Sequence, residues 1–402
     1  MSHALGPARA RIGTATVFFL NGFGYASWVP RLAEVKLDLA LSEAELGFAL
    51  LGVALGALGA MPLSGALANR FGSRRTTTAA LVAFALAQLL IALAPGLALL
   101  FAAFLVVGAA AGALDVAMNA QGVAVERQYG RPIMSSLHGM FSLGAMSGAA
   151  LTGAVAIADL ALLPHLVVIG AIILAVGLPV CRLLLPASFD VGSGQAFAWP
   201  DRSVLVLGLI GLCALLAEGA VGDWSAVYLR QNLDAGTQTA ALAFAAFSFM
   251  MAGGRFLGDR LIARFGGTRI ARTGATVAAL GLAAGLLIAH PAAAIVAFAL
   301  VGAGIACTFP ITLSAAARTE GLPAGTAIAA VCTIGYLGFL AGPPTIGLAA
   351  EVLGLPLALG LLVLVLGTIA LLGGRAGLGA PTPTRPKEAA GPGGATSQSA
   401  AP

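Results

Sequence analysis

Apolar runs of roughly 17 to 25 residues recur from Arg11 to Gly374, separated only by short polar turns. Each run is long enough to cross a hydrocarbon core of about 30 Å as a helix. Charged residues make up 9% of the chain, against about 25% in a soluble domain. The alternation that membrane strands require is absent from these runs. The sequence therefore predicts an all-α membrane protein that crosses the bilayer many times.

We predict twelve transmembrane helices in two six-helix halves. The spans are placed near residues 12–30, 44–66, 75–94, 97–124, 132–157, 164–185, 204–229, 238–258, 269–289, 292–316, 325–349 and 353–373. The halves occupy residues 1–185 and 204–374, and the polar segment 186–203 links them. Residues 375–402 are rich in Pro, Gly, Ala, Ser and Thr, a composition that predicts a disordered tail.

The positive charges predict the orientation. Of the 21 Lys and Arg residues, all but Arg31, Lys36 and Arg230 fall at the same ends of the predicted spans. The positive-inside rule then makes both termini and the linker cytoplasmic. It also accounts for the net charge of +5, so no nucleic-acid partner is expected. We predict a multi-pass protein of the inner membrane, acting as a monomer.

The four cysteines lie within or at the end of apolar runs, without the spacing of a disulfide framework or a metal site. We expect neither a metal nor a cofactor. The first apolar run continues without a small-residue cleavage site and is followed by further spans, which indicates a first transmembrane helix rather than a cleaved signal.

An internal repeat relates the two halves. A shift of 194 residues aligns the Arg-Phe-Gly tripeptides that end at Gly72 and Gly266, and it aligns Val107-Gly108 with Val301-Gly302. It also aligns three glycines of the fifth predicted span with three of the eleventh. Small residues at such spacing favour close helix packing. Two repeats of this kind place a solute site at the midplane, between halves that rock against each other.

Three polar residues, Asp115, Asn119 and His138, interrupt two of the predicted spans. A charge in hydrocarbon costs about 2.5 to 3.5 kcal/mol, so it marks a partner, a cavity or a task. Asp115 and Asn119 are four residues apart and share a helix face, and His138 is expected at nearly the depth of Asn119. A buried carboxyl can take up a proton near neutral pH, where an imidazole also titrates.

We predict that Asp115 carries a proton, with His138 beside it. A structural hydrogen bond between Asp115 and Asn119, and a packing role for His138, stay open as alternatives. The repeat places Phe309, Leu313 and Cys332 at the equivalent positions, so the chemistry is expected in the first half. In the second half, Glu218 is the candidate for a second titrating group.

A small polar solute would be held by polar and aromatic side chains. Asn21, Tyr25 and Trp28 share one face of the first predicted span, and we expect them to line the site with Asn119, opposite Trp224 and Tyr336. The alternative for the aromatic residues is an interfacial belt, above all for Trp28 and Trp224 near the predicted outer boundary.

The segment from Gly65 to Arg75, GALANRFGSRR, resembles the G-x-x-x-D-R-x-G-R-R signature of the major facilitator superfamily (MFS). It departs from that signature in Asn69 and Ser73. The resemblance implies twelve helices and a cytoplasmic latch that gates transport. Its gating residues would be Gly65, Asn69, Arg70, Gly72, Arg74 and Arg75. A second-half counterpart contains Arg255 and Asp259, four residues apart and therefore able to pair on one helix face.

Residues 112–119, with Asp115 followed by Asn119, are similar to the fourth span of the fucose:proton symporter branch of that superfamily, and residues 18–25 are similar to its first span. Including residues 134–139, the pattern is closest to the YbjJ-like members. The resemblance implies proton and sugar handling at Asp115. The first-span carboxylate of that branch is missing, because Val29 occupies its place.

These features predict a secondary transporter that moves a small, sugar-like polar solute by alternating access, coupled to protons as a symporter. Its partners would be the solute, protons and the lipid bilayer. Proton-driven efflux of a metabolite or drug is the alternative transport function, and a membrane ligand sensor is the alternative of another class. An enzyme is not expected, because the four His residues lack a paired acid, nucleophile or metal set.

Overall fold

The computed structural model describes residues 6–157, 160–187 and 201–379, and all regular elements in these ranges are helical. The first bundle comprises α1 (Pro7–Trp28), the 3-10 helix η1 (Val29–Arg31), α2 (Leu32–Asp38), α3 (Glu43–Phe71), α4 (Ser73–Ala87), α5 (Leu89–Leu93), α6 (Leu97–Tyr129), α7 (Met134–Ile157) and α8 (Leu162–Cys181). The second comprises α9 (Arg202–Asn232), α10 (Thr237–Phe265), α11 (Gly267–Ile288), α12 (Pro291–Ile305), α13 (Thr308–Ala316), α14 (Ala324–Leu353) and α15 (Leu355–Leu372).

Nine helical segments of the described residues have the length and hydropathy of a membrane span. The prediction of an all-α membrane protein is thus confirmed. Two predicted spans are interrupted: residues 75–94 form α4 and α5, and residues 292–316 form α12 and α13.

The first helix of the second bundle begins within the last two residues of the predicted linker 186–203. Residues 188–200 lie outside the described residues, but α9 already begins at Arg202, inside the predicted linker. The reason is local, because the Asp201 side chain caps the helix by accepting a hydrogen bond from the Val204 N–H at 2.9 Å. The predicted disordered tail falls mostly on residues 380–402, which also lie outside the described residues.

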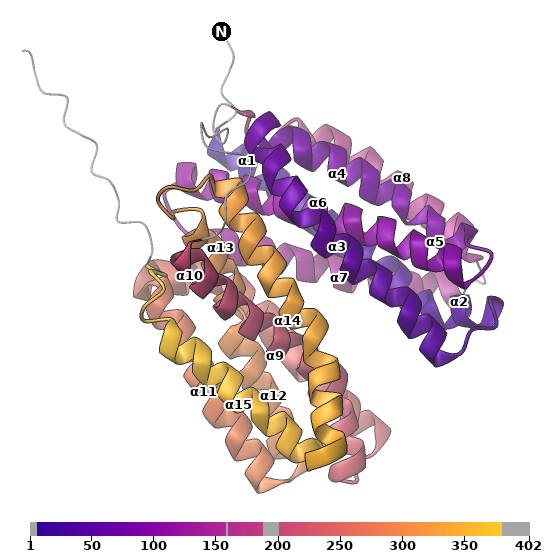
Figure 1. Cartoon of the computed structure of the whole chain (residues 1–402), viewed down its shortest axis with the longest axis vertical. Coiled ribbons are helices and arrows are strands. Elements are labelled where there is room, and N and C mark those ends of the chain that lie inside the picture. Colours follow the sequence, from indigo (N-terminus) through magenta and orange to yellow (C-terminus); the bar gives the residue numbers. More distant parts are fainter. Residues whose placement is uncertain (1–5, 158–159, 188–200, 380–402) are drawn as a thin grey trace, which may run out of the picture.

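The two bundles lie side by side, the first drawn in indigo to magenta and the second in pink to yellow (Figure 1). Within the first bundle, α3 packs extensively on α6 and α1 on α7. Within the second, α9 packs on α14, and α11 and α10 pack on α12. The bundles meet mainly where α3 lies against α14 and α7 against α10. These two seams bring together residues far apart in sequence.

Glycines allow the closest helix contacts, and they do so equivalently in both bundles. A Cβ atom added at Gly108 of α6 would lie 2.0 Å from the carbonyl oxygen of Val53, and one at Gly302 of α12 would lie 2.3 Å from that of Phe247. Both partners in the second contact lie 194 residues after those in the first. The sequence repeat therefore corresponds to a repeat in packing.

The Arg-Phe-Gly repeats form equivalent turns. Gly72 and Gly266 have φ of 88° and 82°, a left-handed conformation in which a side chain is strained. The guanidinium groups of Arg70 and Arg264 lie over the rings of the phenylalanines that follow them, 5.1 and 5.2 Å from the ring centroids. Each turn therefore ends one long helix and redirects the chain into the next.

Candidate functional site

The polar residues of α6 and α7 form one connected group. The Asn119 side chain donates from Nδ2 to the Asp115 carbonyl at 2.8 Å and to its carboxylate Oδ1 at 3.2 Å. Nε2 of His138 lies 3.1 Å from Asn119 Oδ1. Because the amide oxygen can only accept, His138 Nε2 must carry the proton in this hydrogen bond. Asp115, Asn119 and His138 are all buried, so the arrangement links a carboxylate to an imidazole through one amide.

The second carboxylate oxygen of Asp115 is available for other interactions. Oδ2 is buried and has no hydrogen-bond partner among the described residues. Cys332 and Tyr336 of α14 are polar neighbours of this carboxyl group from the second bundle. A buried polar atom without a partner costs about 1 to 3 kcal/mol. Such a cost is expected at a functional site, where a proton or a solute group completes the interaction.

The residues related by the repeat meet at the centre of the protein. The Asp115 carboxyl lies beside Cys332, and the ring of His138 packs edge-on against Phe309 with 5.9 Å between the centroids. Since Phe309 is the repeat equivalent of Asp115 and Cys332 that of His138, the two contacts are equivalent. The asymmetry predicted from the sequence thus lies where the bundles face each other.

Glu218 of α9 and Arg255 of α10 form an ion pair at this centre. Arg255 Nη2 lies 3.2 and 3.1 Å from the two carboxylate oxygens of Glu218. Arg255 Nη1 donates to Ser142 Oγ of α7 at 2.8 Å, so the guanidinium also reaches the first bundle. Arg255 and Asp259, whose spacing would allow them to pair, each have another described partner.

Asp259 instead caps the first turn of α7. Its Oδ1 accepts a hydrogen bond from the backbone N–H of Ser136 at 3.1 Å. Free N–H groups and the helix dipole make a helix N-terminus favourable for a carboxylate. The neighbouring Ser135 hydroxyl donates to the carbonyl oxygen of Arg255 at 2.8 Å. Two adjacent residues of α7 are therefore tied to α10 of the other bundle.

Asn69 makes the equivalent connection from α3. Its Oδ1 accepts from the N–H of Gly325 at 3.1 Å, and its Nδ2 donates to Thr326 Oγ1 at 2.6 Å. Gly65 lies one turn earlier, where an added Cβ would approach the Gly325 carbonyl oxygen to 2.7 Å. Asn69 therefore accepts a hydrogen bond from the backbone of the first turn of α14 and donates one to the Thr326 side chain in the same turn. Asn69 thus connects the bundles although the signature has aspartate there.

The other residues of the predicted latch make their described contacts only with residues of the first bundle. Arg70 and Arg75 are exposed, Arg74 is half-buried, and Gly72 is the buried turn glycine. Arg70 packs over Phe71. Of this group, the structure brings Gly65 and Asn69 to the second bundle.

The residues predicted to bind the solute do not all lie near the opposite bundle. Tyr25 is half-buried and lies near Tyr336 of the second bundle. Asn21 is buried and contacts the Met118 sulfur at 3.6 Å. Trp28 is 2% exposed and packs on Phe104 of α6 with 5.5 Å between the ring centroids. Asn21 and Trp28 therefore have their described contacts inside the first bundle.

Trp224 lies on α9 against α14, where a Cβ added at Gly347 would lie 3.0 Å from its ring. The ring is half-buried. This contact lies within the second bundle, so the structure does not bring Trp224 to Trp28 in the described contacts.

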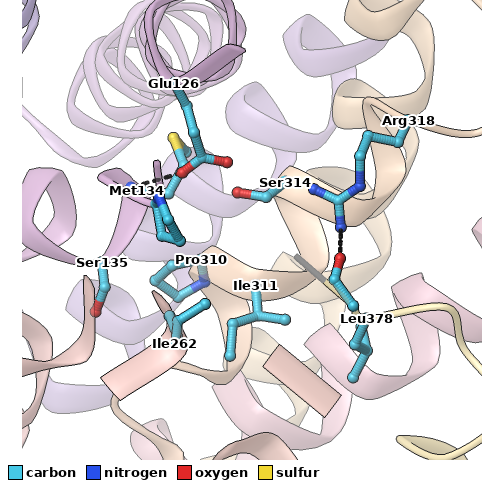
Figure 2. Close-up of a pocket in the computed structure, with 11 residues that line it drawn as sticks. Glu126, Met134, Ser135, Ile262, Pro310, Ile311, Ser314, Arg318 and Leu378 are labelled. Carbon is cyan, nitrogen blue, oxygen red and sulfur yellow. Dashed lines mark hydrogen bonds between the residues drawn. The ribbon is translucent and has the colours of Figure 1, made fainter. Parts of the chain in front are cut away.

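Glu126 is a buried residue that the sequence did not indicate. Its Oε2 accepts from the backbone N–H groups of Ile133 and Met134 at 2.9 and 3.1 Å, so it caps α7 from within the first bundle. A pocket at this end is shared by both bundles (Figure 2). Its lining comprises Glu126, Pro132, Met134, Ser135, Ile262, Pro310, Ile311, Ser314, Arg318, Leu378 and Gly379. None of these residues belongs to the predicted proton or solute site.

Ser135, Ser142 and Cys332 were also missed as functional candidates. Ser135 lies in the 134–139 pattern and Cys332 is the repeat equivalent of His138, but serine and cysteine in membrane helices are most readily explained by packing. Together, these observations define a multi-pass helical membrane protein with buried ionisable groups between two equivalent bundles.

Comparison with known proteins gives the family. The model of the Major Facilitator Superfamily matches residues 14–343. An uncharacterised MFS-type transporter of Yersinia pestis is 36% identical over 362 residues, which cover 90% of this chain and 94% of that protein. The membrane protein MosC of Rhizobium meliloti is 33% identical over 357 residues, covering 88% and 86%. The chain belongs to the Major Facilitator Superfamily.

The fold agrees with this assignment. The crystal structure of the MFS transporter FucP in the outward conformation matches with a TM-score of 0.75 at 17% identity, over 91% of this chain and 98% of that one. The protein is thus a membrane transporter rather than an enzyme, and in bacteria such a multi-pass protein lies in the inner membrane.

Proposed function

We propose that the protein is a proton-coupled symporter that moves a small, sugar-like polar solute by alternating access. The observation that carries the proposal is the buried Asp115 carboxylate, whose Oδ2 has no partner among the described residues and whose neighbours include groups of the opposite bundle. A carboxylate in this position is able to exchange a proton when the bundles move. FucP, which has the same fold, is named as the Escherichia coli fucose:proton symporter.

In this mechanism Asp115 carries the proton. His138, linked to it through Asn119, orients the amide, and Glu218 is the second titrating group. Tyr25 and Tyr336 offer hydroxyl groups to the solute from opposite bundles. Asn21, Trp28 and Trp224 support the walls of the site from within their own bundles.

A solute screen tests the proposal. Purified protein in liposomes would be loaded with a pH-sensitive dye and exposed to individual sugars, sugar acids and polyols. Proton entry on addition of one compound, absent from protein-free liposomes, is the expected result. Proton exit with the same compound would indicate exchange, as proton-driven efflux requires. Solute movement that is independent of pH would contradict symport.

The proposed topology has twelve spans with both termini and the linker cytoplasmic. The halves are residues 1–185 and 204–374, and the protein works as a monomer. Support comes from the nine segments with the length and hydropathy of a span, from the positive charges at one side, and from the repeated packing contacts.

The cytoplasmic gate is formed by two reciprocal helix caps. Asn69 of the first bundle caps α14, and Asp259 of the second bundle caps α7. Both contacts lie at the side of the protein where most of the Arg residues are found, which the proposed topology makes cytoplasmic. Opening the protein toward the cytoplasm requires both caps to break.

Replacing Asn69 with alanine is expected to weaken the closed gate. The change removes two hydrogen bonds between the bundles, a loss of about 1 to 3 kcal/mol, which shifts the ratio of closed to open protein by roughly 5- to 150-fold. Spin labels on cysteines at the exposed positions Arg75 and Arg264 would report it as a longer distance between the bundles, and the native cysteines are buried.

Thr78→Ala is the matched control. Its hydroxyl donates to the Arg74 carbonyl of the same helix at 2.8 Å, and its other described neighbour, Cys181 of α8, belongs to the same bundle, so the distance distribution should stay that of the native protein. An unchanged distribution in Asn69→Ala would contradict the gating role.

A further inference from the structure

Arg255 is a buried cation whose hydrogen-bonding capacity is only partly used. Its side chain is 10% exposed. Nη2 contacts both oxygens of Glu218, and Nη1 contacts Ser142. Nε is buried and has no partner among the described residues. A guanidinium offers five N–H donors and binds a carboxylate best through two parallel hydrogen bonds. The pairing with Glu218 through one nitrogen leaves donors for another oxyanion.

Glu218 is the more accessible member of the pair. Its side chain is 24% exposed, compared with 10% for Arg255. Its described electrostatic neighbours are Arg255 of α10 and Tyr336 of α14. The ionisable groups around Arg255, besides Glu218, include His138 of α7, Cys307, which precedes α13, and Asp259, one turn further along α10. Glu218 is therefore the acid that balances Arg255 in the described structure.

The charge of Arg255 cannot be removed by titration, because a guanidinium stays protonated in proteins. A buried charge that loses its counter-charge is strongly unfavourable. If Glu218 takes up a proton, Arg255 therefore requires another anion. Protonation forms an O–H bond on Glu218, which neutralises the carboxylate and breaks the ion pair. The net charge of the two side chains rises from zero to +1, and it returns to zero when one negative group binds Arg255.

We propose that Arg255 binds the carboxylate of a small hydroxylated acid, such as a sugar acid, and that Glu218 occupies this position until a proton and the solute replace it. This inference rests on the proposed function and names its substrate class. The hydroxyl groups of Tyr25 and Tyr336 would meet the solute hydroxyls. The proton on Glu218 offsets the charge of the solute, so the proton on Asp115 remains the one that couples transport to the membrane potential.

The test compares sugar acids with their neutral counterparts. Full-length purified protein would be titrated with glucuronate and glucose, and with galacturonate and galactose, and binding followed as an increase in Tm. We expect one acid to bind and its neutral counterpart to bind at least about tenfold more weakly, the effect of an unpaired buried partner. Phosphate alone is the second arm, because it separates recognition of a bare oxyanion from that of the hydroxylated acid.

The pH dependence identifies Glu218. In the Asp115→Asn background, binding of the acid should tighten by about tenfold for each unit by which the pH falls, since one proton is taken up with the solute. Adding Glu218→Gln should remove this dependence and leave binding tight at neutral pH. Arg255→Lys should weaken binding and retain the pH dependence. Asp223→Asn, an exposed carboxylate of the same helix, should change neither.

Several results would overturn the inference. They are binding of a neutral sugar in preference to its acid, binding of none of the acids, binding of phosphate alone, or a Glu218→Gln protein that is only less stable and keeps the pH dependence. None of these would affect proton coupling through Asp115, which is judged from transport by the Asp115→Asn protein with whichever solute is moved.

Discussion

Asp115→Asn is expected to abolish accumulation of the solute driven by the membrane potential while leaving its exchange across the membrane largely intact. The substitution keeps an oxygen that accepts from Asn119 Nδ2, so the local hydrogen bond survives. It removes the group that gains and loses a proton, and the side chain stays neutral throughout the transport cycle. Affinity should fall by about fivefold or less, corresponding to about 1 kcal/mol for one altered hydrogen bond.

Two measurements in liposomes separate these effects. Uptake driven by an imposed membrane potential, negative inside, should fall to the level of protein-free liposomes, whereas counterflow between equal solute pools should continue. Asp223→Asn removes an exposed carboxylate from α9 and should leave both rates unchanged. Potential-driven accumulation that persists in Asp115→Asn would show that another group carries this proton, and loss of counterflow as well would assign Asp115 a structural role.

Gly108→Ala is expected to cause a large loss of stability. The added Cβ would lie 2.0 Å from the carbonyl oxygen of Val53, a backbone atom that cannot move by rotation of a side chain. The helices α3 and α6, which pack extensively on each other, would have to separate. Overpacking of this kind typically costs about 1 to 3 kcal/mol, and the backbone contact places Gly108 at the upper end. Thermal unfolding in detergent and the yield of monodisperse protein would measure it.

The repeat supplies a second case and a control. Gly302→Ala, against the carbonyl of Phe247 at 2.3 Å, should behave like Gly108→Ala. Gly59 lies on α3 with nothing within 4 Å of an added Cβ, so Gly59→Ala should be neutral or stabilise by up to about 1 kcal/mol through helix propensity. Equal Tm values for Gly59→Ala and Gly108→Ala would contradict the packing argument.

Local patterns in the sequence were sufficient to predict the helices and the part of the site that the first bundle supplies. Hydropathy gives the membrane-spanning segments, because each run must satisfy its backbone hydrogen bonds internally in lipid. The four-residue spacing of Asp115 and Asn119 places them on one face, and helix geometry then requires their contact. The repeat of 194 residues indicated the equivalent packing seen at Gly108 and Gly302.

Only the tertiary structure decided which helix lies opposite each of these faces. Arg255 and Asp259 share a helix face and are spaced so that they could pair, but Arg255 binds Glu218 and Asp259 binds the first turn of α7. Asn69 reaches residue 326, which is 257 positions away. Periodicity fixes the direction and depth of a side chain on its own helix. Which group that side chain then binds depends on how all the helices pack. The free N–H groups in the first turn of a helix can bind an acceptor side chain, and a sequence pattern of opposite charges does not indicate such a contact.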